Sequence, residues 1–218
     1  MDWTTEVDDY CERLGPGLWA EPLNLLTNAA FLLAALVMAR RCRGMPTGQA
    51  LAAVLALIGL GSGLFHSVAT RWAAVADVAP ILGFILLYVF AASRDFLGLR
   101  PAFALVAAAL FLPYAAATLP LFRLIPGIGS SAAYAPVPAL ILAYALALVR
   151  RAPRTAVRLG LGAAMLIVSI TFRSLDAPLC PHWPTGTHFL WHLLNGLMLG
   201  WMIETWRRHM LEAGPAGR

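Results

Sequence analysis

Histidine, serine and aspartate residues at the ends of apolar segments are the parts of this sequence best suited to chemistry. His188 and His192 are spaced four residues apart, so on a helix both imidazoles project from one face. Ser62 and His66 have the same spacing at the end of a glycine-rich stretch, and Asp77 follows eleven residues later. Three imidazoles beside a carboxylate and a hydroxyl favour a metal site that works on water.

The residue types also indicate which role each side chain would take. Three neutral imidazoles hold zinc well and leave one position for a water, whose pKa the ion lowers to about 7. The segment from His188 to His192 lacks the glutamate of the HExxH pattern of soluble zinc proteases. Asp77 is therefore the expected base, and Ser62 is expected to orient the water or donate to a developing oxyanion.

The composition indicates that lipid surrounds most of the chain. Of 218 residues, 60% are hydrophobic and 12% are charged, with a mean hydropathy of +0.74. A soluble domain usually carries about a quarter charged residues. The net charge of +5 does not indicate nucleic acid, because the arginines lie between apolar runs rather than on one face. The acidic start is unlike a cleavable signal peptide.

The predicted fold is all-α: a polytopic membrane protein with seven transmembrane helices of about 20 residues each. Residues 1–20 form an acidic extracytoplasmic segment, residues 21–206 the membrane domain, and residues 207–218 a basic cytoplasmic tail. The seven predicted helices cover residues 21–40, 48–68, 75–94, 101–119, 132–150, 156–174 and 187–206.

Arginine placement predicts the orientation, because cytoplasmic loops of membrane proteins carry the basic excess. Twelve arginines fall on one side of the predicted helices and only four on the other, which also holds the acidic N-terminus. The N-terminus is therefore expected outside and the C-terminus in the cytoplasm. This orientation places all five candidate site residues in the outer half of the membrane.

Each candidate residue has a simpler interpretation when it is taken alone. A single histidine at a helix end is most often interfacial, and an HxxxH pair is weak evidence by itself. Ser62 would ordinarily bond back to its own helix, and Asp77 would ordinarily cap one. Their shared depth favours the joint interpretation, because ionisable groups inside a membrane usually mark a site.

A set of motifs along nearly the whole chain resembles one known family. In order, they are Asp9-Tyr10-Cys11-Glu12, Ala20-Glu21-Pro22-Leu23-Asn24, Thr27-Asn28, Gly61-Ser62-xx-Phe65-His66, Asp77, Leu175-Asp176-xxx-Cys180 and His188-xx-Trp191-His192. The sequence is similar to the alkaline ceramidases, within the larger group of seven-helix membrane hydrolases that includes adiponectin-receptor-like proteins.

The resemblance implies an intramembrane zinc amidohydrolase that cleaves ceramide, a membrane lipid, into a sphingoid base and a fatty acid. It implies that His66, His188 and His192 bind the zinc, with Asp77 and Ser62 around the catalytic water. It also implies a calcium site at Asp9, Tyr10 (through its carbonyl), Glu12, Leu14 and Glu21. Leu14 departs from the family pattern, which has an amide side chain at this position, and the segment before Glu21 is two residues shorter.

Two further pairs are expected near the site. Cys11 and Cys180 both fall on the outer, oxidising side, and we predict a disulfide between them. Arg173 and Asp176 are spaced three residues apart, and they either support the site through a salt bridge or form an ordinary helix-end pair.

Other functions remain open at this point. The same scaffold could hydrolyse an ester or another amide in a different membrane lipid, since the sequence carries no acyl-chain or headgroup code. A receptor or sensor could use the histidines to hold a structural zinc. A transporter is less favoured, because Glu204 is the only acid within the cytoplasmic half of a predicted helix.

Overall fold

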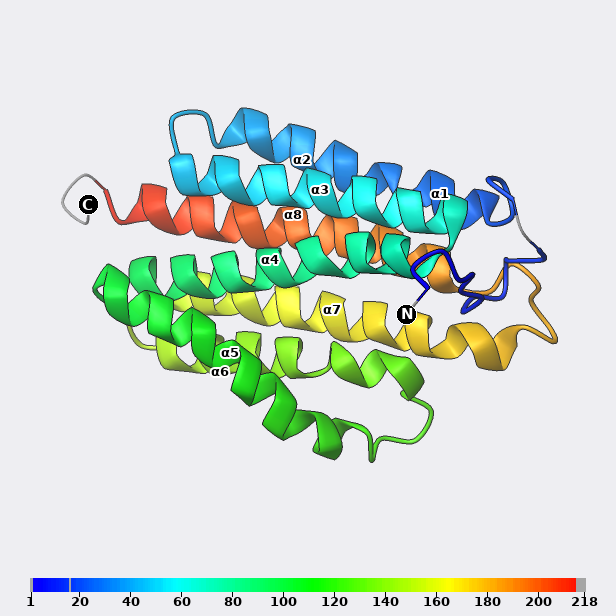
Figure 1. Ribbon diagram of the computed structural model, residues 1–218. Helices are drawn as coiled ribbons and strands as arrows, with labels where there is room; N and C mark the ends of the chain where they lie inside the picture. Colours follow the sequence, from blue (N-terminus) through cyan, green and yellow to red (C-terminus); the bar gives the residue numbers. More distant parts are fainter. Residues whose placement is uncertain (1, 16, 215–218) are drawn as a thin grey trace.

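The computed structural model describes residues 2–15 and 17–214, and long helices make up most of it (Figure 1). The helices are α1 (Pro22–Thr27), α2 (Ala29–Arg41), α3 (Pro46–Val68), α4 (Arg71–Asp95), α5 (Pro101–Phe122), the 3-10 helix η1 (Gly129–Ala133), α6 (Pro136–Leu148), α7 (Pro153–Leu179) and α8 (His188–Glu212). Proline opens several of them, at a position where its missing N–H has no helical partner to lose.

The prediction of an all-helical, polytopic membrane protein is confirmed. Six segments within the described ranges are long and apolar enough to cross a membrane, with α1–α2 and η1–α6 each forming one segment. The seventh predicted helix is present as α8, which is 25 residues long. Its sequence is more polar than those of the other long helices. It carries His188, His192, Asn195 and Glu204, and these side chains are buried inside the bundle.

The structure differs from the sequence prediction mainly at helix ends. The first predicted helix is divided into α1 and α2 at Asn28, and the fifth begins as a 3-10 helix. The last two helices run beyond their predicted ends, to Leu179 and Glu212. The α8 helix continues because Glu204 pairs with Arg207 and Arg208 one turn later, which makes the charged end a stable helix.

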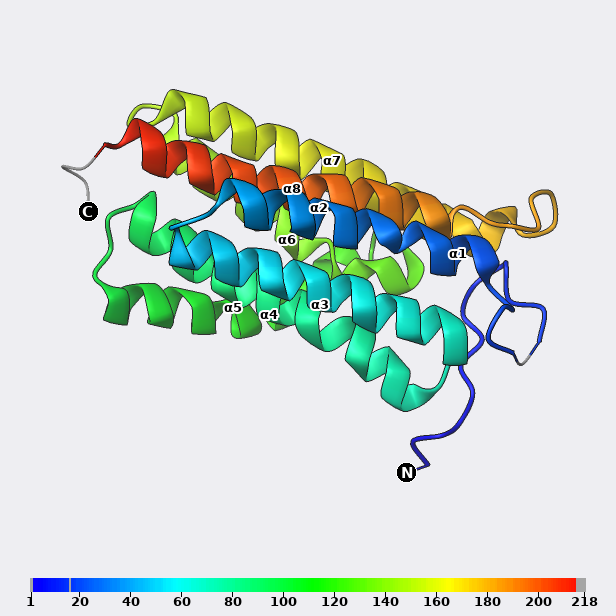
Figure 2. The ribbon, with the colours of Figure 1, turned by 90° about the horizontal axis from the view of Figure 1, so that it is seen from above.

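Helix α8 runs through the middle of the bundle (Figures 1 and 2). It packs against α2 and α7, and also contacts α1, α3 and α4. On one side of α8, helix α3 packs between α2 and α4. On the other side, α6 packs on α7. Helix α5 lies outermost and leans across α6 (Figure 1). This arrangement brings the start of α8 next to the end of α3.

Small residues and lipid-facing leucines both fit a membrane bundle. Gly61 in α3 faces the backbone of Ala76 in α4 so closely that a Cβ has no room there, and Gly196 in α8 approaches Ala30 in α2. On the outer faces, leucines such as Leu197 are 60% exposed. Lipid is the natural solvent for such faces.

The N-terminal segment crosses the end of the bundle where α3 meets α4 and where α8 begins (Figure 1). The Val7 N–H donates to the Ala69 carbonyl at 2.7 Å, and the Arg71 N–H donates to the Thr5 carbonyl at 3.1 Å. A disulfide joins Cys11 to Cys180 at the end of α7. This segment therefore closes one end of the bundle.

Candidate metal centre

Three buried histidines converge between α3 and α8. His66 lies in the last turn of α3, and His188 and His192 lie in the first two turns of α8. Each offers one ring nitrogen, and these nitrogens all lie within 4.8 Å of one another. The three side chains are at most 2% exposed. Residues far apart in sequence thus form one compact cluster.

The ring nitrogens of this cluster fit a metal ion. Nε2 of His66, Nδ1 of His188 and Nε2 of His192 are buried without a hydrogen-bond partner in the described protein. An unpaired polar atom in a dry interior costs free energy, and three that converge on one place point to a missing common partner. The cluster could therefore hold a metal ion, and three imidazoles are a typical zinc set.

Two neighbours fix the orientation of the rings from α1. The Nδ1–H of His66 donates to Oε2 of Glu21 at 2.6 Å. The Thr27 hydroxyl donates to the Leu23 carbonyl, so its oxygen is left to accept the Nδ1–H of His192 at 3.0 Å. Both rings consequently present an unprotonated Nε2 to the cluster. Carboxylates and hydroxyls commonly orient metal-binding histidines in this way.

Glu21 is a second buried carboxylate beside the cluster. Sequence analysis pointed to Asp77 alone as an acid near the site, but Glu21 lies directly behind His66 and is 1% exposed. Burial alone would raise the pKa of Glu21, but the hydrogen bonds from His66, Asn24 and Arg13 hold it below its ordinary value. Its two oxygens are thus already occupied by donors from Arg13, His66 and Asn24.

Asp77 and Ser62 lie together where α3 and α4 touch. The close approach at Gly61 brings the backbone of Ala76 and Asp77 against α3, beside the next residue, Ser62. His66 lies one helical turn beyond Ser62 in α3. Asp77 is therefore close to the part of α3 that carries Ser62 and His66.

Asp176 fixes the start of α8. Its Oδ1 accepts the backbone N–H groups of Thr187 and His188 at 2.7 and 2.9 Å, and its Oδ2 accepts that of Cys11 at 3.0 Å. A carboxylate at this position satisfies N–H groups that a helix start leaves unpaired. The residue thus positions His188 and ties the N-terminal segment to α7.

The predicted salt bridge between Arg173 and Asp176 does not form, because each side chain has other partners. Arg173 donates to the Tyr10 hydroxyl at 3.2 Å and to Ser130 and Ser131 in η1. Tyr10 in turn stacks on His188, with ring centroids 3.7 Å apart. Both predicted support residues touch the site's surroundings, but through separate contacts.

The structure does not support the predicted calcium site. Among the described residues, Asp9, Glu12 and Glu21 do not gather into a metal-binding group. Both oxygens of Glu12 accept backbone N–H groups at the start of α1, and the Leu14 side chain is 89% exposed. Tyr10 contributes its ring to the histidine cluster. Glu12 and Glu21 therefore have structural partners instead.

Sequence reasoning missed three neighbours of the cluster. Thr27 was noticed only as part of a motif, Tyr10 was expected to bind calcium through its carbonyl rather than to stack on His188, and Arg13 was only one of four outer arginines. A polar residue in the first turn of an apolar helix, at the depth of the histidines, is a signal that could have identified Thr27. Arg13 carries no local signal, because its partner Glu21 is eight residues away and becomes a neighbour only on folding.

Fold and site together define a polytopic membrane protein with a buried three-histidine centre near one end of its helical bundle. A family model described as Ceramidase matches residues 4–213, so the chain belongs to the ceramidase family. The match covers the N-terminal segment, all the helices and the cluster. No curated protein matched the chain at a significant level.

Proposed function

We propose that the protein is a zinc-dependent intramembrane hydrolase that cleaves the N-acyl amide of ceramide. The observation that carries the proposal is the convergence of three buried imidazole nitrogens without partners, in a chain of the ceramidase family. Hydrolysis adds water across the amide, so the C–N bond breaks and a fatty acid and a sphingoid base leave.

His66, His188 and His192 would hold the zinc through the nitrogens that face the cluster. Zinc in such a site supplies a Lewis acid that activates water near neutral pH. Glu21 and Thr27 keep two of the rings in the tautomer that this requires.

Asp77 and Ser62 would carry the proton and stabilise developing charge. Asp77 accepts a proton from the attacking water and returns it to the amine nitrogen as the C–N bond breaks. The Ser62 hydroxyl donates to the carbonyl oxygen as negative charge develops there. Ser62 is buried and Asp77 is half-buried between α3 and α4, so access of bulk water is limited and these interactions are strengthened.

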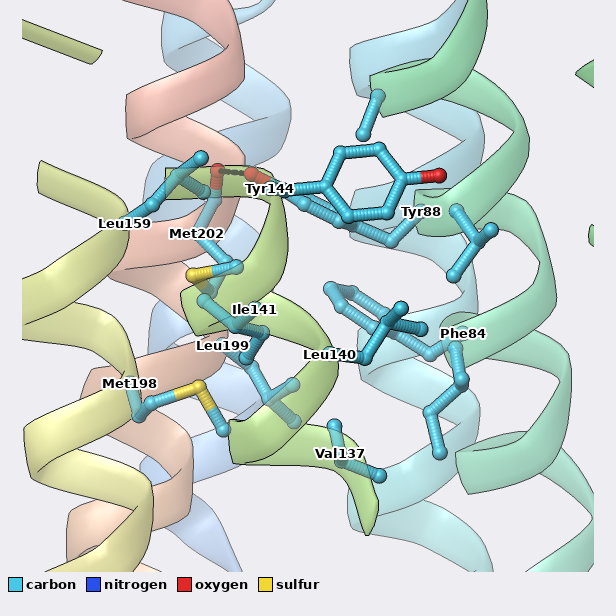
Figure 3. Close-up of a pocket in the computed structure, with 13 residues that line it drawn as sticks. Phe84, Tyr88, Val137, Leu140, Ile141, Tyr144, Leu159, Met198, Leu199 and Met202 are labelled. Carbon is cyan, nitrogen blue, oxygen red and sulfur yellow. Dashed lines mark hydrogen bonds between the residues drawn. The ribbon is translucent and has the colours of Figure 1, made fainter. Parts of the chain in front are cut away.

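Small apolar cavities near the cluster could take a short part of a lipid's hydrocarbon chain. One of about 50 Å³ is lined by Phe31 and Trp191, and the Phe31 ring lies 6.0 Å from that of His192. A second, of about 60 Å³, shares Phe84, Met198 and Leu199 with the first and continues between α4, α6 and α8 (Figure 3). A chain held here would leave its amide at the histidines.

Filling this space should change acyl-chain preference. Met198→Phe is expected to shift activity toward shorter chains, because about 0.8 kcal/mol of burial is lost for each methylene excluded, or about fourfold in kcat/KM. Fatty-acid release from a chain-length series measures the shift. Leu197→Phe, on the lipid-facing side of the same helix, is the matched control. Equal profiles for the two variants would contradict the assignment of the cavity.

We also propose that the cluster faces the extracytoplasmic side, with the N-terminus outside and the C-terminus in the cytoplasm. The support is the arginine asymmetry, which places the basic end of α8 in the cytoplasm. A tag after the C-terminus should resist protease in intact cells and be cleaved once they are permeabilised. Cleavage in intact cells would reverse the orientation.

The function is tested by incubating purified protein with a lipid panel. Ceramides, other N-acyl lipids and ester lipids are supplied separately, and the released fatty acid and amine are quantified. The proposal predicts release from ceramide that stops when zinc is removed and returns when zinc is restored. Preferential release from an ester lipid would assign a different substrate to the same scaffold. Lack of turnover on every lipid would favour a receptor with a structural zinc.

A further inference from the structure

A buried arginine lies behind the histidine cluster. The Arg13 side chain is 2% exposed, and its Nε donates to Oε1 of Glu21 at 2.6 Å. Its Nη1 donates to the Gly15 carbonyl at 3.2 Å, and its Nη2 to the His66 carbonyl at 3.4 Å. Glu6 adds a carboxylate 3.9 Å from Nη1. The guanidinium is thus surrounded by carboxylate and carbonyl oxygens.

Arg13 and His66 share a single carboxylate. Oε1 of Glu21 accepts from Arg13, while Oε2 accepts from His66 and from the Asn24 side chain. A charge that is buried this deeply needs a well-placed opposite charge, and loss of one partner leaves the other uncompensated. The short contact to Arg13 therefore fixes the carboxylate that orients His66.

The oxygens around Arg13 are of the kinds that calcium prefers. The cation that this place holds is the guanidinium, which contacts both Glu21 and the His66 carbonyl. Glu12, another expected calcium ligand, is engaged with the backbone of Leu23 and Asn24. The described residues consequently do not fit a calcium ion at this position.

We propose that Arg13 is a positioning residue that takes the place of the calcium ion expected from the family resemblance. It locks Glu21 against His66, so the metal centre is held in shape without calcium. The inference rests on the zinc site of the proposed function, and it concerns how that site is supported.

The first test uses the unmodified protein, freed of calcium and replete with zinc. Calcium titrated into it is expected to produce no binding heat, no rise in Tm and no change in turnover. Calcium binding that raises Tm or activity would overturn the proposal. This measurement needs no variant, so a folding defect in a mutant cannot obscure it.

The second test compares zinc affinity, measured by chelator competition, in Arg13→Gln, Arg13→Lys and the control Arg123→Gln. Arg123 is an exposed arginine expected on the same side, so its variant removes the same charge away from the cluster. Loss of partners behind a metal ligand typically costs about 10–100-fold in affinity, which is the expected effect of Arg13→Gln. Arg13→Lys keeps the positive charge, so its zinc affinity should lie between those of Arg13→Gln and Arg123→Gln. Equal losses in Arg13→Gln and Arg13→Lys, or none in either, would overturn the proposal.

A double-mutant cycle separates positioning through Glu21 from a general structural effect. If Arg13 acts through that carboxylate, Arg13→Gln should lower zinc affinity little further in a Glu21→Gln background. Fully additive losses would contradict the proposal. Neither calcium binding nor zinc affinity depends on the lipid cleaved. Lack of ceramide turnover with these results intact would therefore reject the proposed function and leave the inference standing.

Discussion

Replacing His66 by alanine is expected to remove the metal and the activity together. His66 joins α3 to the two histidines of α8, and its Nε2 faces them without another partner. Two imidazoles on one helix would remain, which is one fewer than zinc sites with an open position normally use. Zinc per chain should fall to near zero, and fatty-acid release to the uncatalysed background. Metal analysis and the lipid assay on the same preparation measure both.

A matched control for this variant is available on the chain. His182 is an exposed histidine in the loop before α8, and His182→Ala removes an imidazole without touching the cluster. That variant should keep both zinc and turnover. Activity retained in zinc-free His66→Ala protein would rule out the mechanism proposed for the site.

Asp77→Asn is expected to separate chemistry from metal binding. The substitution keeps the size of the side chain but removes the carboxylate that is proposed to carry the proton. Zinc content should stay near that of the unmodified protein, while kcat falls by about 10²–10⁴-fold, the usual contribution of a positioned acid or base. Substrate binding should change little.

The outcome of this variant also decides the role of Asp77. Asp8→Asn, at an exposed position in the N-terminal segment, controls for loss of one negative charge on the same side. Loss of zinc from Asp77→Asn would show that the residue is a structural ligand. Turnover equal to that of Asp8→Asn would show that another group moves the proton.

Much of the fold and the heart of the site can be predicted from the sequence. Apolar segments of membrane-spanning length identify the helices, and histidines inside such segments stand out because polar groups are costly there. The arginine pattern places His66, His188 and His192 at one depth, and the structure brings them together. These features are either local in the sequence or follow because successive helices cross the membrane in opposite directions.

The supporting contacts could not be predicted in the same way. Glu21 and His66 are 45 residues apart, and their hydrogen bond depends on how α1 and the N-terminal segment fold over the end of α3. Arg173 and Asp176 have the spacing of a helix pair, but tertiary partners attract each of them more strongly. Spacing describes which side chains can meet, whereas competition among buried partners decides which do.

The most direct test of the central claim is X-ray absorption at the zinc edge of the purified protein. The proposed zinc site predicts about one zinc per chain with three imidazole nitrogens and one oxygen at about 2.0–2.1 Å. Protein without zinc, or zinc bound by fewer than three imidazoles, would contradict it.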